Sequence, residues 1–208
     1  MPIGVGAEPA FKYPAQYLHQ VPARSPTLTG EKVLVIGVAG TGKSYLVKKM
    51  KRLKVNAVDA DEGLATFVDG EGSEVEYDPH GGAQWWKSHY YVLRLEKLER
   101  LLRKKGTVYL FGDVGGQPGM RNGLVDVAHL FDRVYYLNAP ARLIEERLAR
   151  RMDNPFGKNP EEVKGVMKHR VKLEETARRI KFEIVDATLP VNEIIRILTR
   201  GAVQPAPR

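Results

Sequence analysis

Short runs of apolar, often β-branched residues alternate with longer amphipathic stretches through most of the chain. Five such runs predict strands, at 32–37, 55–59, 107–111, 133–137 and 182–185. The stretches between them repeat apolar positions with the period of a helix. Apolar strands separated by helices form a parallel sheet covered on both faces. The pattern therefore predicts an α/β fold with a doubly wound, five-stranded parallel sheet.

Helices are predicted at 43–53, 84–105, 123–130, 140–152, 160–179 and 191–200. Pro140 suits the first turn of its helix, because a proline there costs no backbone hydrogen bond. Thr66 to Gly82 interrupts the alternation. Two short alternating runs there flank Asp69 to Ser73, which favours a small hairpin or a mobile flap.

The two ends of the chain differ from its middle. The first 30 residues hold five prolines and little periodicity, which predicts a flexible arm, and residues 201–208 read as a frayed tail. With 43% hydrophobic residues, residues 31–200 suffice for one core. No apolar run approaches the roughly 18 residues of a membrane span, and no secretory signal is evident. A cytoplasmic protein without membrane contact is expected.

The strongest motif lies between the first predicted strand and helix. Residues 37–44 match G-x-x-x-x-G-K-[ST] in the strand-loop-helix context of a phosphate-binding P-loop. The glycines allow successive N–H groups to point at phosphates, and the helix N-terminus adds partial positive charge. ATP contacts are predicted at Gly37, Val38, Ala39, Gly40, Thr41, Gly42, Lys43, Ser44 and Tyr45. Lys43 is expected to reach the β and γ phosphates, and Ser44 to ligate Mg²⁺.

Acidic residues follow two further strands, at the sheet edge where ligands of such folds bind. Asp59 and Asp61 follow the second strand; Asp59 is a candidate metal or acceptor ligand, and Asp61 a candidate base or acceptor contact. Asp113 follows the third strand and is a candidate ligand of the metal or its waters. Gly115 and Gly116 beside it would let an acceptor approach the backbone. Capping or turn roles for these acids remain alternatives.

A cationic region follows the fourth strand. Arginines on the two sides of the loop NPFGKNP could close over a triphosphate and neutralise charge developing on the transferred group. Arg150 and Arg151 are candidate catalytic residues together with Lys43 and Asp61. A solvated helix face, with acidic partners at neighbouring positions, is the competing interpretation.

An aromatic group opens the stretch after the flap. Trp85, Trp86 and Arg94 are candidate acceptor contacts, and His89 is a weaker candidate base. Aromatic residues at helical spacing also commonly fill a core, and that alternative stays open.

The order of these features resembles the nucleoside monophosphate kinase-like family of P-loop kinases over about residues 31–200. VDADE (58–62) resembles the Asp-x-Asp of shikimate kinases, and LFGDVGGQPG (110–119) resembles their glycine-rich turn and the acid of adenylate kinases. The resemblance implies strand order 2-3-1-4-5, an acceptor-binding region at 66–105 and a lid at 150–170. It also implies that Arg147 and Pro190 flank the adenine, with Arg150, Arg151 or Lys158 in the lid.

The predicted function is phosphate transfer from Mg²⁺-ATP to a small acceptor, first of all a nucleotide or nucleoside. The adenylate kinase substrate motif, the Asp-Arg-Tyr/Phe of deoxynucleoside kinases and the arginine-proline pair of shikimate kinase lids are absent. A sugar-like or shikimate-like acceptor is therefore a close alternative, followed by a nucleic-acid base or end and by a non-catalytic ATP switch. The net charge of +8 keeps nucleic acid possible as a partner.

Cysteine is absent from the chain, which excludes disulfides, thiolate metal sites and a cysteine nucleophile. The expected cofactor is accordingly Mg²⁺ bound by oxygen ligands. A guanine-specific switch is disfavoured, since no Asn-Lys-x-Asp motif occurs.

Overall fold

The computed structural model describes residues 30–152 and 154–200. The predicted arm, apart from Gly30, and the predicted tail lie outside the described residues. Within them, five parallel strands form the main sheet: β1 (Lys32–Ile36), β2 (Ala57–Asp59), β6 (Val108–Gly112), β7 (Arg133–Asn138) and β8 (Glu183–Asp186). Their order is β2-β6-β1-β7-β8. Numbered as the five predicted strands, this is 2-3-1-4-5, so the predicted fold class is confirmed.

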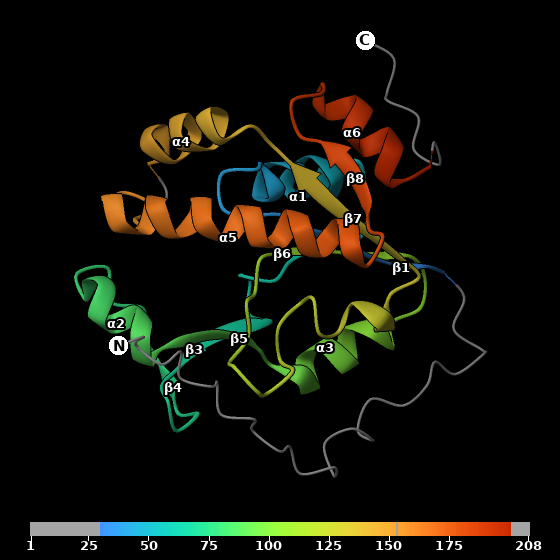
Figure 1. Ribbon diagram of the computed structural model, residues 1–208. Coiled ribbons are helices and arrows are strands. Elements are labelled where there is room, and N and C mark those ends of the chain that lie inside the picture. The colour runs from blue at the N-terminus through green and yellow to red at the C-terminus, as the bar shows by residue number, and fades with distance from the viewer. Residues whose placement is uncertain (1–29, 153, 201–208) are drawn as a thin grey trace, which may run out of the picture.

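Helices cover both faces of this sheet (Figure 1). They are α1 (Lys43–Arg52), α3 (Leu95–Leu102), α4 (Ala141–Arg150), α5 (Pro160–Arg179) and α6 (Val191–Leu198). The crossover from β1 to β2 through α1 and the crossover from β2 to β6 through α3 run in opposite directions along the sheet. Because such crossovers are right-handed, α1 and α3 lie on opposite faces. The helix α6 packs on α1, and α5 packs on β7. Among the described residues, no helix is long and apolar enough to cross a bilayer.

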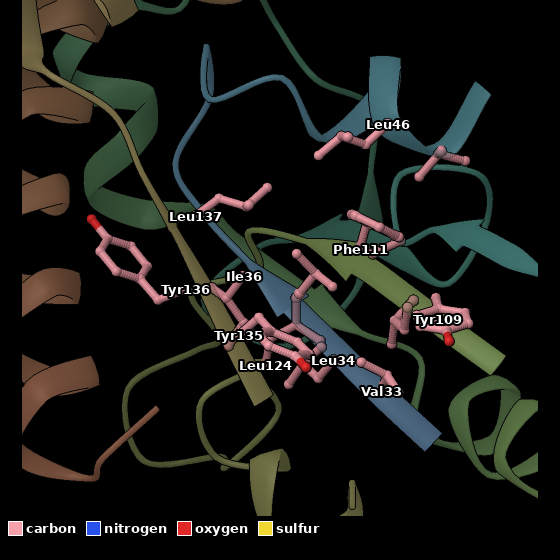
Figure 2. Packing of buried hydrophobic residues seen from close by; sticks show 14 of the residues in the cluster. Val33, Leu34, Ile36, Leu46, Tyr109, Phe111, Leu124, Tyr135, Tyr136 and Leu137 are labelled. Atoms are coloured by element: carbon pink, nitrogen blue, oxygen red, sulfur yellow. The ribbon is translucent and has the colours of Figure 1, made fainter. Parts of the chain in front are cut away.

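The core forms around the central strand β1. Val33, Leu34 and Val35 have no exposed surface, and Leu34 pairs in register with Leu110 of β6 and Val134 of β7. Figure 2 shows the side chains of these strands packed together with Leu46 of α1 and Leu124. β1 is buried on both faces and bonded on both edges, as is β6, so both strands are tightly constrained.

A second, antiparallel sheet follows β2. It contains β3 (Ala65–Val68), β4 (Glu74–Val75) and β5 (Tyr90–Leu93) in the order β4-β3-β5. The predicted hairpin is confirmed, since β3 and β4 are joined by a turn in which Asp69 Oδ1 accepts hydrogen bonds from the backbone N–H groups of Glu71 and Ser73, both 2.9 Å. We call residues 65–94 the inserted module; Figure 1 shows it beside α5, separate from the main sheet.

The predicted long helix at 84–105 is wrong. The structure has a short helix, α2 (Gly82–Ser88), then β5 and then α3. Four aromatic or aliphatic residues, Tyr90–Leu93, pair with β3, with Tyr90 opposite Val68 and Leu93 opposite Ala65. Such residues favour strands, and pairing with a distant segment outweighs the local helical period.

The helix predicted at 123–130 is also wrong, because only its last three residues, Ala128–Leu130, form a 3-10 helix. The N–H of Leu124 donates to the carbonyl of Val114 at 2.9 Å, and the N–H of Gly123 donates to Asp126 Oδ2 at 3.0 Å. These hydrogen bonds pack the segment against the loop that follows β6. The N–H groups of Gly123 and Leu124 are therefore not bonded as they would be in a helix.

We predict that Gly112→Ala destabilises the fold. A Cβ at Gly112 would lie 2.8 Å from Ala60 Cβ and 2.7 Å from Leu124 Cδ1, and overpacking of this kind costs roughly 1–3 kcal/mol. Gly115→Ala is the control, because nothing lies within 4 Å of its Cβ position. Chemical denaturation measures both variants, and equal free energies of unfolding would contradict the prediction.

Candidate active site

The P-loop has the backbone shape that its glycines allow. Gly40 has φ of +86° and Gly42 has φ of +101°. A Cβ at Gly37 would lie 2.9 Å from Thr41 Oγ1, and one at Gly40 would lie 3.0 Å from Ile144 Cγ2. The loop is therefore enclosed by α4 and β7 and curls tightly into α1, whose N-terminus favours a bound anion.

Lys43 lies over the P-loop that precedes it. Its ammonium group donates to the carbonyls of Gly37 and Val38, the latter at 3.1 Å, and the residue is 9% exposed. The positive charge of Lys43 is thus held within the loop whose N–H groups would bind phosphate.

Ser44 is joined to the end of β2. Its hydroxyl donates to Asp59 Oδ2 at 2.8 Å. Burial raises the pKa of Asp59, as does the charge of Asp61, while hydrogen bonds from Ser44 and the Asp61 N–H oppose this rise. The contact confirms that the two predicted metal candidates Ser44 and Asp59 lie together.

Asp61 links the P-loop side to the inserted module. Its N–H donates to Asp59 Oδ1 at 3.2 Å, and its own Oδ1 accepts a hydrogen bond from the hydroxyl of Tyr91 at 2.7 Å. Burial and then the charge of Asp61 raise the pKa of Tyr91 well above its usual range, so this hydroxyl stays a donor. Asp61 is exposed, which leaves its carboxylate accessible to a substrate.

Tyr91 is a residue of the candidate site that the sequence analysis does not select. The signal available was the run Tyr90 to Leu93, which was read as part of a helix. In the strand β5, Tyr91 pairs with Phe67 of β3, which directs it to the same region as the end of β2.

The glycine loop after β6 lies against the same strand. The N–H of Gly116 donates to the carbonyl of Tyr91 at 2.9 Å, and a Cβ at Gly116 would lie 2.6 Å from the nitrogen of Gly123. Gly115 is exposed, with open space at its Cβ position. Gly116 is thus needed for the loop to close. Gly115 leaves its backbone open to a close approach, and contact of either glycine with an acceptor stays a prediction.

Asp113 lies beside α5. Its Oδ1 is 2.8 Å from Nε2 of His169, a residue that sequence reasoning did not select. The hydrogen bond with Asp113 raises the pKa of His169, while burial and the charge of Lys43 lower it. His169 therefore joins Asp113 to α5 and is itself influenced by the charge of Lys43. The role of Asp113 as a metal ligand stays a prediction.

Most of the basic residues around the predicted lid donate hydrogen bonds to backbone carbonyls. Arg147 Nη1 donates to the carbonyls of Gly40 at 3.2 Å and Thr41 at 3.1 Å, and so braces the P-loop. Arg151 donates to the carbonyl of Phe156. Lys158 donates to the carbonyls of Leu148 at 2.9 Å and Ala149 at 2.7 Å, which caps the C-terminus of α4.

Three further candidates lie near the surface. Arg150 is exposed at the last position of α4. Tyr45 is 54% exposed on α1, with the ammonium of Lys49 5.5 Å from its ring centre. Pro190 directly precedes α6. Their predicted contacts with ATP or the transferred phosphate stay predictions.

The aromatic cluster, which we define as Phe67, Tyr77, Trp85, Trp86, Tyr91 and Phe156, fills the space between the module and the lid. Phe67 is its centre, with ring centroids 4.6 Å from Tyr91 and 5.1 Å from Trp85. Phe156 of the lid loop lies 5.7 Å from Trp86. Trp85 and Trp86 thus pack ring against ring, and contact of either with an acceptor stays a prediction.

A buried carboxylate joins the lid to the module. Glu162 near the start of α5 is 9% exposed; it accepts a hydrogen bond from the hydroxyl of Tyr77 and another, of 2.7 Å, from the N–H of Gly157. Burial and Glu162 raise the pKa of Tyr77 well above its usual range. The lid loop and the module are therefore held together by one acidic side chain.

The oxygen groups of Ser44 and Asp59 suit Mg²⁺, which binds proteins through one or two oxygen ligands and completes its shell with phosphate and water. Among the described residues, no group of three or more histidine, cysteine or acidic side chains forms a metal site of its own. Mg²⁺ held here would accordingly enter with a nucleotide.

Neither a protein-family model nor a curated protein matches the sequence. Solved structures do resemble the fold. Shikimate kinase from Acinetobacter baumannii in complex with shikimate aligns with 86% of this chain and 97% of its own, at 15% identity and a TM-score of 0.51.

Two further small-molecule kinases align over most of this chain. A gluconokinase from Sinorhizobium meliloti 1021 covers 84% of this chain and 92% of its own at 16% identity, with a TM-score of 0.47. Deoxyadenosine kinase from M. mycoides with bound dATP covers 81% and 97% at 16% identity, with a TM-score of 0.46. The chain is thus structurally similar to P-loop small-molecule kinases over most of its length.

We predict that Tyr77→Phe loosens the lid. The change leaves the buried Glu162 with one donor fewer, at a cost of about 1–3 kcal/mol. Hydrogen exchange should show protection of the amides of residues 154–160 falling by roughly tenfold or more. Tyr90→Phe, which removes a hydroxyl from the same module, is the control; unchanged protection in Tyr77→Phe would contradict the prediction.

Proposed function

We propose that this protein is an ATP-dependent kinase that transfers the γ-phosphate of ATP to a small molecule, of which a nucleoside or nucleotide is our first choice. The observation that carries the proposal is the line of hydrogen bonds from Ser44 through Asp59 and Asp61 to Tyr91. It connects a phosphate-binding loop to an exposed carboxylate at the edge of the inserted module.

Each part of this line has a chemical role in phosphate transfer. The N–H groups of the P-loop and Lys43 bind the triphosphate and stabilise negative charge on it. The carboxylate of Asp61 accepts the proton of the acceptor's attacking hydroxyl. The oxygen of that hydroxyl bonds to the γ-phosphorus, while the bond between the γ-phosphorus and the bridging oxygen breaks and ADP leaves with that oxygen. Tyr91 keeps Asp61 in place. Mg²⁺ held by Ser44 and Asp59 would neutralise charge on the phosphates.

The remaining regions follow from this arrangement. Residues 31–200 would be the kinase domain, with 66–105 as the acceptor-binding region and 150–170 as the lid. The sharing of Phe156 and Glu162 between lid and module supports this division, because closing the lid would then exclude water from the transferred phosphate. Arg150 is our candidate for a cation that turns toward the phosphates.

A screen for acceptors tests the proposal. ADP release is measured with Mg²⁺ and ATP in the presence of nucleosides, nucleoside monophosphates, sugars, shikimate-like acids and oligonucleotides. We predict acceptor-dependent ADP release that Lys43→Ala lowers by at least about 100-fold, as expected for the loss of one charge-stabilising donor. Lys48→Ala, an exposed position on α1, is the control. ADP release that no acceptor accelerates would indicate an ATP switch instead.

We further predict that Asp61→Asn lowers kcat by roughly 100-fold or more while the affinity for ATP changes little, since a general base acts on the acceptor hydroxyl. Single-turnover transfer and equilibrium ATP binding separate the two effects. A parallel loss of ATP affinity would place Asp61 among the groups that bind the metal-nucleotide complex and not with the acceptor.

A further inference from the structure

The charge of the region next to the candidate base is opposite to that of the protein. Residues 61–94 contain seven acidic and two basic side chains, whereas the whole chain has a net charge of +8. The two basic residues are Lys87 and Arg94. A negative region of this kind lowers the local concentration of anions, including anionic substrates.

Arg94 directly follows β5, the strand that carries Tyr91, and its guanidinium is already paired with a carboxylate. Its Nε and Nη2 donate to the two carboxylate oxygens of Glu74 at 2.8 and 2.7 Å. Its Nη1 donates to the carbonyls of Gly63 and Ala65 at 3.2 and 3.3 Å. The bidentate pair is the geometry with which arginine binds a carboxylate or phosphate ligand, and here the carboxylate comes from the protein itself.

The pair with Glu74 persists at neutral pH. The hydrogen bond from Arg94 holds the pKa of Glu74 below its usual range, so this carboxylate stays ionised. Lys87 lies on α2 and donates to Gln84 at 3.2 Å. Arg121, on the glycine loop, also has an interaction partner. Asp61 itself is hydrogen-bonded to another carboxylate, Asp59, and to the neutral hydroxyl of Tyr91. The lysines that contact the next two residues are also engaged, since Lys51 pairs with Glu62 at 2.6 Å and Lys97 donates to the carbonyl of Gly63 at 3.1 Å.

We infer that the acceptor of this kinase carries no anionic group: it is an uncharged hydroxyl compound such as a nucleoside or polyol, and not a nucleotide, a sugar acid or a nucleic-acid end. The inference rests on the proposed function and narrows it. A carboxylate or phosphate beside Asp59, Asp61 and the acids of the module would meet repulsion, because the one bidentate cation of the module is bound to Glu74.

The test uses pairs of acceptors that keep the same attacking hydroxyl and differ by one anionic group, such as thymidine and its 3′-monophosphate, and glucitol and gluconate. Transfer from radiolabelled ATP gives kcat/KM for each. We expect the neutral member of the productive pair to exceed its anionic partner by about tenfold or more, as like-charge repulsion in a binding site predicts.

Two variants connect the preference to Arg94. Glu74→Gln removes the carboxylate that holds the guanidinium and should lower the neutral-to-anionic ratio several-fold. Glu71→Gln, in the turn of the same hairpin, removes one negative charge but leaves the Arg94 pair intact and should leave the ratio unchanged. Circular dichroism verifies that both variants fold. If Glu74→Gln does not fold, the neutral-to-anionic ratio of the wild-type protein alone decides whether the acceptor is uncharged.

The outcomes separate this inference from the proposed function. Faster transfer to the anionic member of a pair overturns the inference and leaves the kinase activity standing. An equal change of the ratio in both variants overturns the part assigned to the Arg94 pair, since the net charge of the module then sets the preference. Transfer to no acceptor at all overturns the proposed function, and the inference falls with it.

Discussion

The register of three neighbouring parallel strands is the constraint on which the candidate site depends. Asp59 of β2 pairs with Phe111 of β6, and Phe111 pairs with Val35 of β1. The carboxyl ends of the three strands therefore lie at one level, and the P-loop begins just beyond β1. A shift of one residue in either pairing would move Asp59 away from Ser44 and turn alternate side chains to the other face. The burial of β1 on both faces prevents such a shift.

The inserted module makes further side-chain contacts with the residues that follow β2 and with the loop before α5. Tyr91 reaches Asp61 through its hydroxyl and the glycine loop through its carbonyl. Glu162 joins Tyr77 to the backbone of Gly157. Because both contacts involve buried or partly buried polar groups, each depends on the other side being in position. The inserted module and the loop before α5 are thus coupled through side chains and not only through their places in the chain.

The division of charge gives the two halves of the site different chemistry. The P-loop contributes Lys43, the helix N-terminus of α1 and the nearby Arg147, which together suit a triphosphate. Asp61, beside the inserted module, and residues 62–94 form a region in which acidic side chains outnumber basic ones. A protein with a net positive charge can in this way attract ATP on one side and select against anions on the other.

Features that depend on neighbouring residues could be predicted from the amino-acid sequence alone. The P-loop between strand and helix, the five parallel strands, the hairpin at 69–73 and the helix α5 each follow from local pattern, since turn glycines and hydrophobic periods act within a few residues. The predicted partners Ser44 and Asp59 could also be placed, because parallel strands end at the same edge of a sheet.

Which groups distant in the sequence meet depends on how the elements pack together. The run Tyr90 to Leu93 has apolar positions compatible with helix or strand, and its pairing with β3 made it a strand. That choice brought Tyr91 to Asp61. His169 and Glu162 lie on a correctly predicted helix, yet their partners Asp113 and Tyr77 are 56 and 85 residues away. Arg94, a candidate acceptor contact in the sequence, is paired in the fold with Glu74, 20 residues away. Such contacts arise from packing between elements, which no local pattern encodes.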